Sequence, residues 1–115
     1  MDFDFNCGFT TELKNGLTVS VQFHDGALGL RDDDGKLVNV EMACWKTDKD
    51  KLWLSSDVWP EECQSADVVG YVHVNEVIHL IDAATQMSAR YVDVLANQRA
   101  TANAKRCTML QQIEE

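Results

Sequence analysis

The chain has 115 residues, of which 45% are hydrophobic and 25% are charged, and its formal net charge is −9. This length fits one domain of ordinary size, and the hydrophobic content is too high for a disordered chain. A chain this acidic is not expected to bind duplex nucleic acid by neutralising phosphates. We therefore predict that nucleic acid is not a direct partner.

The sequence offers no sign of a targeting or membrane-spanning segment. It lacks a basic N-terminal stretch followed by an apolar run, and no stretch reaches the ~20 apolar residues that cross a bilayer. Cys7, Cys44, Cys63 and Cys107 form no C-x-x-C pair, which excludes a zinc ribbon and a thioredoxin-like motif. We expect reduced thiols and a cytoplasmic protein, although Cys7–Cys44 and Cys44–Cys63 disulfides remain open.

The first 72 residues predict an antiparallel β-meander. Its clearest strand covers 17–23, where apolar and polar residues alternate strictly. Asn15-Gly16 before this strand predicts a two-residue hairpin turn, because both residue types tolerate positive φ. A preceding strand is therefore expected over 8–13. Further strands are expected over 36–45, 51–55 and 67–72.

The chain after Gly70 contains neither glycine nor proline, which favours helix. Apolar residues from Val74 to Met87 recur at i, i+3, i+4 and i+7, so they predict an amphipathic helix covering the sheet. Residues 88–115 are surplus to a core of this size and form either a continuation of that helix or a second one.

The predicted fold class is therefore α+β. We expect an antiparallel β-meander of four to five strands packed by a C-terminal helix, with a helical extension. The predicted division is an acidic domain over residues 1–87 and a helical extension over residues 88–115.

Charge is distributed unevenly between these two parts. Residues 1–72 hold 14 acids and 6 bases, whereas residues 88–113 hold Arg90, Arg99, Lys105 and Arg106 against Asp93 alone. The sequence therefore predicts an acidic head with a mildly basic helical tail.

Histidines and carboxylates form only weak motifs. Glu76, His79 and Asp82 share a face of the predicted helix, but Glu-x-x-His is half of a di-iron site and occurs once. His24 has no nucleophile motif beside it. We therefore predict no enzymatic activity, no catalytic residue, no metal site and no cofactor. A hydrolase or metalloenzyme using His24, His73 and His79 is the least favoured alternative.

Exposed carboxylates in turns can imitate the charges of a nucleic-acid backbone and occupy a basic groove on a partner protein. The alternative is that they serve solubility. Core packing is the favoured interpretation of the tryptophans, and a protein-contact patch is the alternative, because tryptophan is enriched in binding hot spots. The predicted partner-binding residues are Asp32, Asp33, Asp34, Asp48, Asp50, Trp53, Asp57, Trp59, Glu61 and Glu62.

The helical extension would span more than a 115-residue domain can cover if it continued the first helix without a break. It would then need a partner or a fold-back, and a homodimer through this helix is one solution. The predicted oligomerisation residues are Tyr91, Leu95, Ala102, Met109 and Ile113.

Three segments carry a resemblance to a known group of proteins. They are 15–23 (NGLTVSVQF), 38–45 (VNVEMACW) and 69–77 (VGYVHVNEV). This pattern resembles small proteins of tailed bacteriophages and prophages, in which an N-G-x-T-V-S-V-Q-[FW] hairpin precedes an A-x-W strand and a G-Y-x-[TS]-P-[DE]-E-V helix start. His73-Val74 stands where that group has a Thr/Ser cap and a proline, so we expect Asn75 to cap the helix instead.

The resemblance covers about residues 9–87 and implies a source and a fold more than an activity. Together with the acidity, it favours a small phage or mobile-element accessory protein, acting in the host cytoplasm. Such a protein would bind a host protein with a basic surface and could inhibit a nucleic-acid-binding machine, in the manner of an anti-defence or anti-CRISPR protein. The alternative is a structural or assembly module that oligomerises through its long C-terminal helix.

Overall fold

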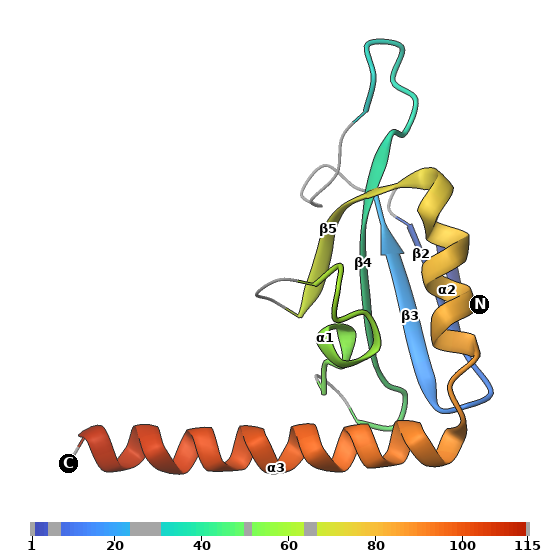
Figure 1. Cartoon of the computed structure of the whole chain (residues 1–115). Helices are drawn as coiled ribbons and strands as arrows, with labels where there is room; N and C mark the ends of the chain where they lie inside the picture. Colours follow the sequence, from blue (N-terminus) through green and yellow to red (C-terminus); the bar gives the residue numbers. More distant parts are fainter. Residues whose placement is uncertain (1, 5–7, 24–30, 50–51, 64–66, 115) are drawn as a thin grey trace.

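The computed structural model describes residues 2–4, 8–23, 31–49, 52–63 and 67–114 (Figure 1). No helix among these residues is long and apolar enough to cross a membrane. Predictions that fall on Cys7, His24 and Asp50 lie outside the described residues.

Five strands form one antiparallel sheet in which each strand pairs with its neighbour in the chain. This arrangement confirms the predicted α+β class and the meander. The strands are β1 (Asp2–Asp4), β2 (Gly8–Glu12), β3 (Leu17–Gln22), β4 (Asn39–Lys46) and β5 (Val68–His73).

The other elements of the structure are three helices and a 3₁₀ turn. They are α1 (Ser55–Val58), the 3₁₀ turn η1 (Val74–Glu76), α2 (Val77–Thr85) and α3 (Ala89–Glu114). Helix α2 lies across the sheet, whereas α3 passes the end of the sheet and projects beyond it (Figure 1). The extension is therefore a second helix. Its start is marked by Ser88, whose Oγ accepts a hydrogen bond of 3.1 Å from the Tyr91 N–H.

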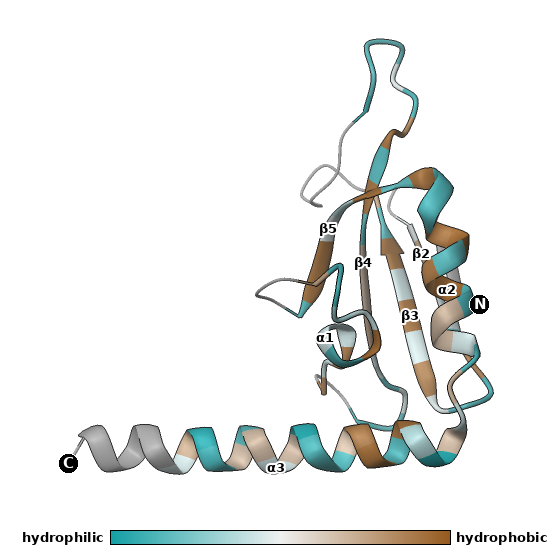
Figure 2. Ribbon diagram, in the orientation of Figure 1, coloured by the Kyte–Doolittle hydropathy of each residue, from teal (hydrophilic) through white to brown (hydrophobic). Residues whose placement is uncertain are grey.

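The core lies between one face of the sheet and α2. Alternate residues of β3 and β4 supply the sheet side, as the period-2 pattern predicts. On the other face of β3, Thr18 and Ser20 are also buried. Leu80 and Ala84 supply the helix side. Figure 2 shows apolar residues on the central strands and along α2, and in α3 mainly near its start. The sheet residues of the core are Leu17, Val19, Val21, Val40, Met42, Cys44, Val69 and Val72.

The hairpin turn before β3 is tied to the end of α2 by Asn15. Its Nδ2 donates to the carbonyls of Ala84 and Met87, at 2.8 and 2.9 Å. Its Oδ1 accepts from the Leu17 N–H at 3.2 Å. Gly16 follows with a φ of 93°. Asn15 therefore forms the predicted turn and also ties it to the segment in which α2 ends.

The segment predicted as a strand over 51–55 differs from the expectation. Trp53 forms a single bridge with Trp45, and α1 begins at Ser55. Pairing of β5 with β4 ends at Ala43, so the next stretch of the β4 edge is available to residues 52–55. The Leu54 N–H donates to the Cys44 carbonyl at 2.9 Å, and the Ser55 hydroxyl accepts from the Cys44 N–H at 2.9 Å.

The helix cap is also different from the prediction. His73, not Asn75, caps the first turn, because its Nδ1 accepts a hydrogen bond of 3.1 Å from the Asn75 N–H. The turn that follows β5 begins at Val74, so the preceding residue, in extended conformation, occupies the capping position.

The first part of α3 is anchored to the domain. Val92 is fully buried and Ala96 nearly so, and both belong to the core, which therefore extends beyond Met87. Arg99 binds both carboxylate oxygens of Asp57, at 3.0 and 3.1 Å. From residue 100 to residue 108, every side chain of α3 is exposed.

Candidate functional site

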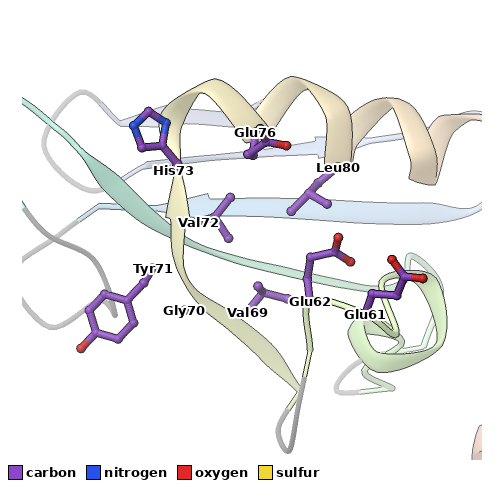
Figure 3. A pocket seen from close by; sticks show the side chains of 9 residues that line it. All are labelled: Glu61, Glu62, Val69, Gly70, Tyr71, Val72, His73, Glu76 and Leu80. Atoms are coloured by element: carbon purple, nitrogen blue, oxygen red, sulfur yellow. The ribbon is translucent and has the colours of Figure 1, made fainter.

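A cleft of about 350 Å³ opens between β5, the start of α2 and the turn that follows α1. We call it the β5 cleft, and Figure 3 shows the side chains around it. Its lining consists of Glu61, Glu62, Val69, Gly70, Tyr71, Val72, His73, Glu76 and Leu80.

The floor of the β5 cleft is apolar. Val69, Val72 and Leu80 are 5–7% exposed and come from β5 and α2. The Trp59 indole Nε1 donates to the Leu80 carbonyl at 2.9 Å, which ties the turn after α1 to α2. The walls of the cleft are therefore positioned by the domain core.

A β-bulge brings two valines of β5 to this floor. Val72 pairs with Val40 and Val69 pairs with Met42, so Gly70 and Tyr71 together face a single residue of β4. In a regular strand, residues three apart point to opposite faces. The extra residue of the bulge places Val69 and Val72 on the same side.

The bulge also exposes Tyr71. This residue has a φ of 56°, the positive value that costs an L-residue roughly 1–2 kcal/mol, and its side chain is 57% exposed. In Figure 3 its ring points away from Glu76 and Leu80. Bulges are common where a strand re-aims a side chain beside a functional site.

The opening of the β5 cleft is lined by carboxylates. Glu61 and Glu62 are exposed on the turn after α1, and Glu76 is exposed in η1. Their side chains stand around the opening in Figure 3. None of the described residues that line it is a lysine or arginine, and the sequence from 52 to 89 holds six acids and neither of these bases. The cleft therefore has negative potential at its opening and apolar surface at its base.

The histidine of the lining has a structural role. Because Nδ1 of His73 accepts the capping bond from Asn75, this nitrogen carries no proton in that arrangement. His79 and Asp82 lie exposed on α2. Among the described residues, no group of three or more His, Cys, Asp or Glu side chains is placed to hold a metal ion.

The predicted acidic residues do not form a single surface. Asp32, Asp33 and Asp34 occupy the tip of a hairpin at one end of the sheet (Figure 1). The Asp32 carboxylate accepts from the backbone N–H groups of Asp34 and Lys36, at 3.0 and 2.8 Å, and so shapes this tip. Asp48 lies at the opposite end of β4.

Two of these carboxylates are neutralised inside the molecule. Lys46 lies between Asp48 and Asp93, at 3.0 and 3.4 Å, and the hydrogen bond with Lys46 lowers the pKa of Asp48 below its usual value. The half-buried carboxylate of Asp57 binds Arg99. Glu61 and Glu62 are therefore the predicted acids that the fold places beside an apolar cleft.

The tryptophans separate into core and surface. Trp59 is 2% exposed, so its prediction as a partner-binding residue is wrong. The error arises because the turn containing Pro60 folds back onto α2 and carries the indole into the core. Trp53 is half-buried and packs edge-on against Trp45, with ring centroids 5.3 Å apart.

The predicted oligomerisation residues include both exposed and buried side chains. Tyr91 is 50% exposed and Ala102 is exposed, whereas Leu95 is only 8% exposed. Leu95 is therefore wrong as a contact residue, because the domain itself covers it. The side chains of Met109 and Ile113 lie outside those that the structure describes.

Cys44 carries a free thiol, so it forms neither of the two disulfides that the sequence left open. Burial raises the pKa of this thiol to about 12, against a smaller opposing effect of its hydrogen bond with Ser55. Such a thiol stays protonated and unreactive. Cys107 is a free thiol on the exposed part of α3.

The sequence does not indicate that the residues of the β5 cleft lie together in one site. The sequence marks Glu61 and Glu62 by their charge, whereas Glu76 stands out in it only as part of a weak metal motif. The signal that could have found the cleft is the absence of lysine and arginine from residues 52–89.

No protein-family model, curated protein or solved structure matches this chain.

Proposed function

We propose that this protein is a binding module that recognises a basic surface of another protein through the β5 cleft. The observation that carries this proposal is the combination of an apolar floor with three glutamates and, among the described lining residues, no lysine or arginine. A lysine or arginine side chain matches this combination, because its apolar stem can lie on the floor while its cationic head meets the carboxylates. Binding rather than catalysis is the activity that this chemistry favours.

Within this role, we propose an accessory protein of a phage or mobile element that inhibits a host nucleic-acid-binding machine. Proteins that bind nucleic acid carry basic grooves for phosphates, and an acidic protein can occupy such a groove. The net charge of −9 and the resemblance of residues 9–87 to phage proteins support this proposal. Inhibition would then arise from competition for the groove.

The test compares three immobilised proteins in a bacterial lysate: the wild type, the cleft variant Glu61→Lys/Glu62→Lys, and the hairpin variant Asp33→Lys/Asp34→Lys. The two variants carry the same change of charge at different sites. We expect the wild type and the hairpin variant to retain the same protein, which high salt releases, and the cleft variant to lose it.

Retention of the same proteins by the wild type and the cleft variant would contradict a role for the cleft. For the inhibitory role, the retained protein is purified and its affinity for DNA is measured by fluorescence anisotropy. We expect the wild type to weaken DNA binding and the cleft variant to leave it unchanged. Unchanged DNA affinity with the wild type would contradict inhibition.

A second candidate function is assembly through α3, and one observation supports it. Side chains 100–108 of this helix are all exposed, although a short helix without packing is only marginally stable in water. A second molecule packed along this segment would stabilise it.

A further inference from the structure

The outer part of α3 is a projecting helix whose described side chains, those of residues 100–108, are all exposed. Arg99 makes the last described contact, with Asp57, and residues 100–108 are exposed. The helix runs straight away from the sheet in Figure 1. Its outer end therefore cannot reach the β5 cleft of the same molecule, and only another molecule can cover it.

The chemistry of this outer end is opposite to that of the cleft. Residues 94–113 contain three bases, Arg99, Lys105 and Arg106, and no acid. Arg99 forms an ion pair with Asp57, whereas the exposed Lys105 and Arg106 have no ion pair among the described residues. Thr101 and Ala102, one turn before them, are small and leave a shallow groove on this side of the helix. Two adjacent cationic side chains are thus presented without steric cover.

We propose that Lys105 and Arg106 of one molecule bind in the β5 cleft of a second copy of the chain, which gives a homodimer. Their stems would lie on the apolar floor, and their cationic heads would meet Glu61, Glu62 and Glu76. If each molecule supplies its helix to the other, the two contacts are identical, as in the two-fold dimers that dominate soluble homo-oligomers. This inference rests on the proposed role of the cleft in recognising cationic side chains.

Charge complementarity within the chain supports a second copy as the occupant. Residues 52–89 hold six acids without a lysine or arginine, and residues 94–113 hold three bases without an acid. One pair between these segments already forms inside the molecule, where Arg99 binds Asp57 with two hydrogen bonds. Contact between copies would extend the same pairing to the remaining bases of α3.

The test measures the molecular mass of the full chain by analytical ultracentrifugation at low and high salt. We expect the wild type to be dimeric at low salt and to dissociate at high salt, because exposed ion pairs are screened. The helix variant Lys105→Glu/Arg106→Glu and the cleft variant Glu61→Lys/Glu62→Lys should each be monomeric. The control variants Arg90→Glu and Asp33→Lys/Asp34→Lys should dimerise like the wild type.

An equimolar mixture of the helix variant and the cleft variant provides the decisive measurement. The acidic helix end of one would match the basic cleft of the other, and the unchanged helix end and cleft would match in the opposite direction. We expect the mixture to form a heterodimer. Circular dichroism of each variant checks that loss of the dimer is not loss of the fold, and a folded pair that stays monomeric when mixed would overturn the proposal.

Two other outcomes would also overturn it: a wild type that is monomeric at low salt, or a dimer that persists in both charge variants. The second would assign the interface to another surface. A monomeric wild type whose captured partner is still lost in the cleft variant would remove only this inference. A monomeric wild type whose capture is unaffected by the cleft variant would remove the proposed function as well.

Discussion

The two parts of α3 have the same secondary structure but different surroundings. In the inner part, residues 89–99, Val92, Leu95 and Ala96 are buried and Arg99 is paired. In the outer part, residues 100–108, every side chain is exposed. One helix of 26 residues thus has an inner part that packs on the domain and an outer part that is exposed to solvent.

The difference shows that helix formation and helix packing have separate causes. The inner part has apolar residues at i, i+3 and i+4, which form a stripe that the domain can cover. The outer part has alanines at 100, 102 and 104 among polar residues, and alanine favours helix without supplying a large apolar surface. Helix propensity therefore continues α3, while the absence of a stripe leaves its outer part unpacked.

The largest effect is expected when an aspartate is introduced into the inner part of α3, and the same residue introduced into the outer part provides the contrast. Val92→Asp places an unpaired charge at a fully buried position and should lower the free energy of unfolding by about 3 kcal/mol or more. Ala100→Asp, at an exposed position, should change it by less than about 1 kcal/mol, mainly through the lower helix propensity of aspartate. Urea denaturation followed by circular dichroism measures both values. Similar losses for the two variants would show that the outer part is packed.

The cysteines offer a second contrast, between the buried Cys44 and the exposed Cys107. Burial raises the pKa of Cys44 from 9.0 to about 12, so the folded state holds this proton more tightly than the unfolded state. The contribution of this thiol to the free energy of unfolding is fully present below pH 9 and is lost as the pH rises from 9 to 12. The free energy of unfolding should fall there by up to about 1.4 kcal/mol per pH unit from this group.

Urea denaturation across this pH range measures the slope. Cys44→Ala should remove this contribution, whereas Cys107→Ala should leave the slope unchanged. If all three proteins had the same slope, Cys44 would not be the group responsible.

The third prediction concerns the ion pair at the boundary between the two parts. Arg99→Met keeps the apolar stem but removes both hydrogen bonds to Asp57, which stays half-buried. We expect a loss of about 1 kcal/mol in the free energy of unfolding, because the pair is partly exposed to solvent. Arg90→Met, at an exposed position, is the matched control and should be close to neutral. Equal losses would mean that the pair does not anchor α3.

The smallest effect on stability is expected from shortening the outer part. A chain that ends at Ala104 keeps the anchored part of α3 and one turn beyond it. Its unfolding free energy at high salt, where the dimer is dissociated, should match that of the full chain within about 0.5 kcal/mol. Ultracentrifugation at low salt should show a monomer, because Lys105 and Arg106 are absent. A loss well above this limit would place part of the outer helix in the fold.

Much of the fold could be predicted because it depends on short-range patterns. Strict alternation over 17–23 predicts β3, and Asn15-Gly16 predicts its hairpin with β2. Helical periodicity after Val74 predicts α2. The same periodicity does not decide whether α3 continues α2 or is a second helix, because the break between them is marked only by Ser88. The candidate site was less predictable, because the cleft joins residues from three elements and Trp59 is carried inward by a turn.

The sequence by itself determined the two electrostatic characters of this protein, an acidic stretch without bases and a basic stretch without acids, because charge follows from composition alone. It also indicated strands β2 to β5 and helix α2, since alternation and helical spacing are local, but it indicated neither β1 nor α1. Only the tertiary structure decided that Val69 and Val72 share one face, that Asn15 holds the end of α2, and that Lys105 and Arg106 project into solvent. Each of these depends on a bulge, a long-range hydrogen bond or a missing contact between segments distant in the chain, and no local pattern records it.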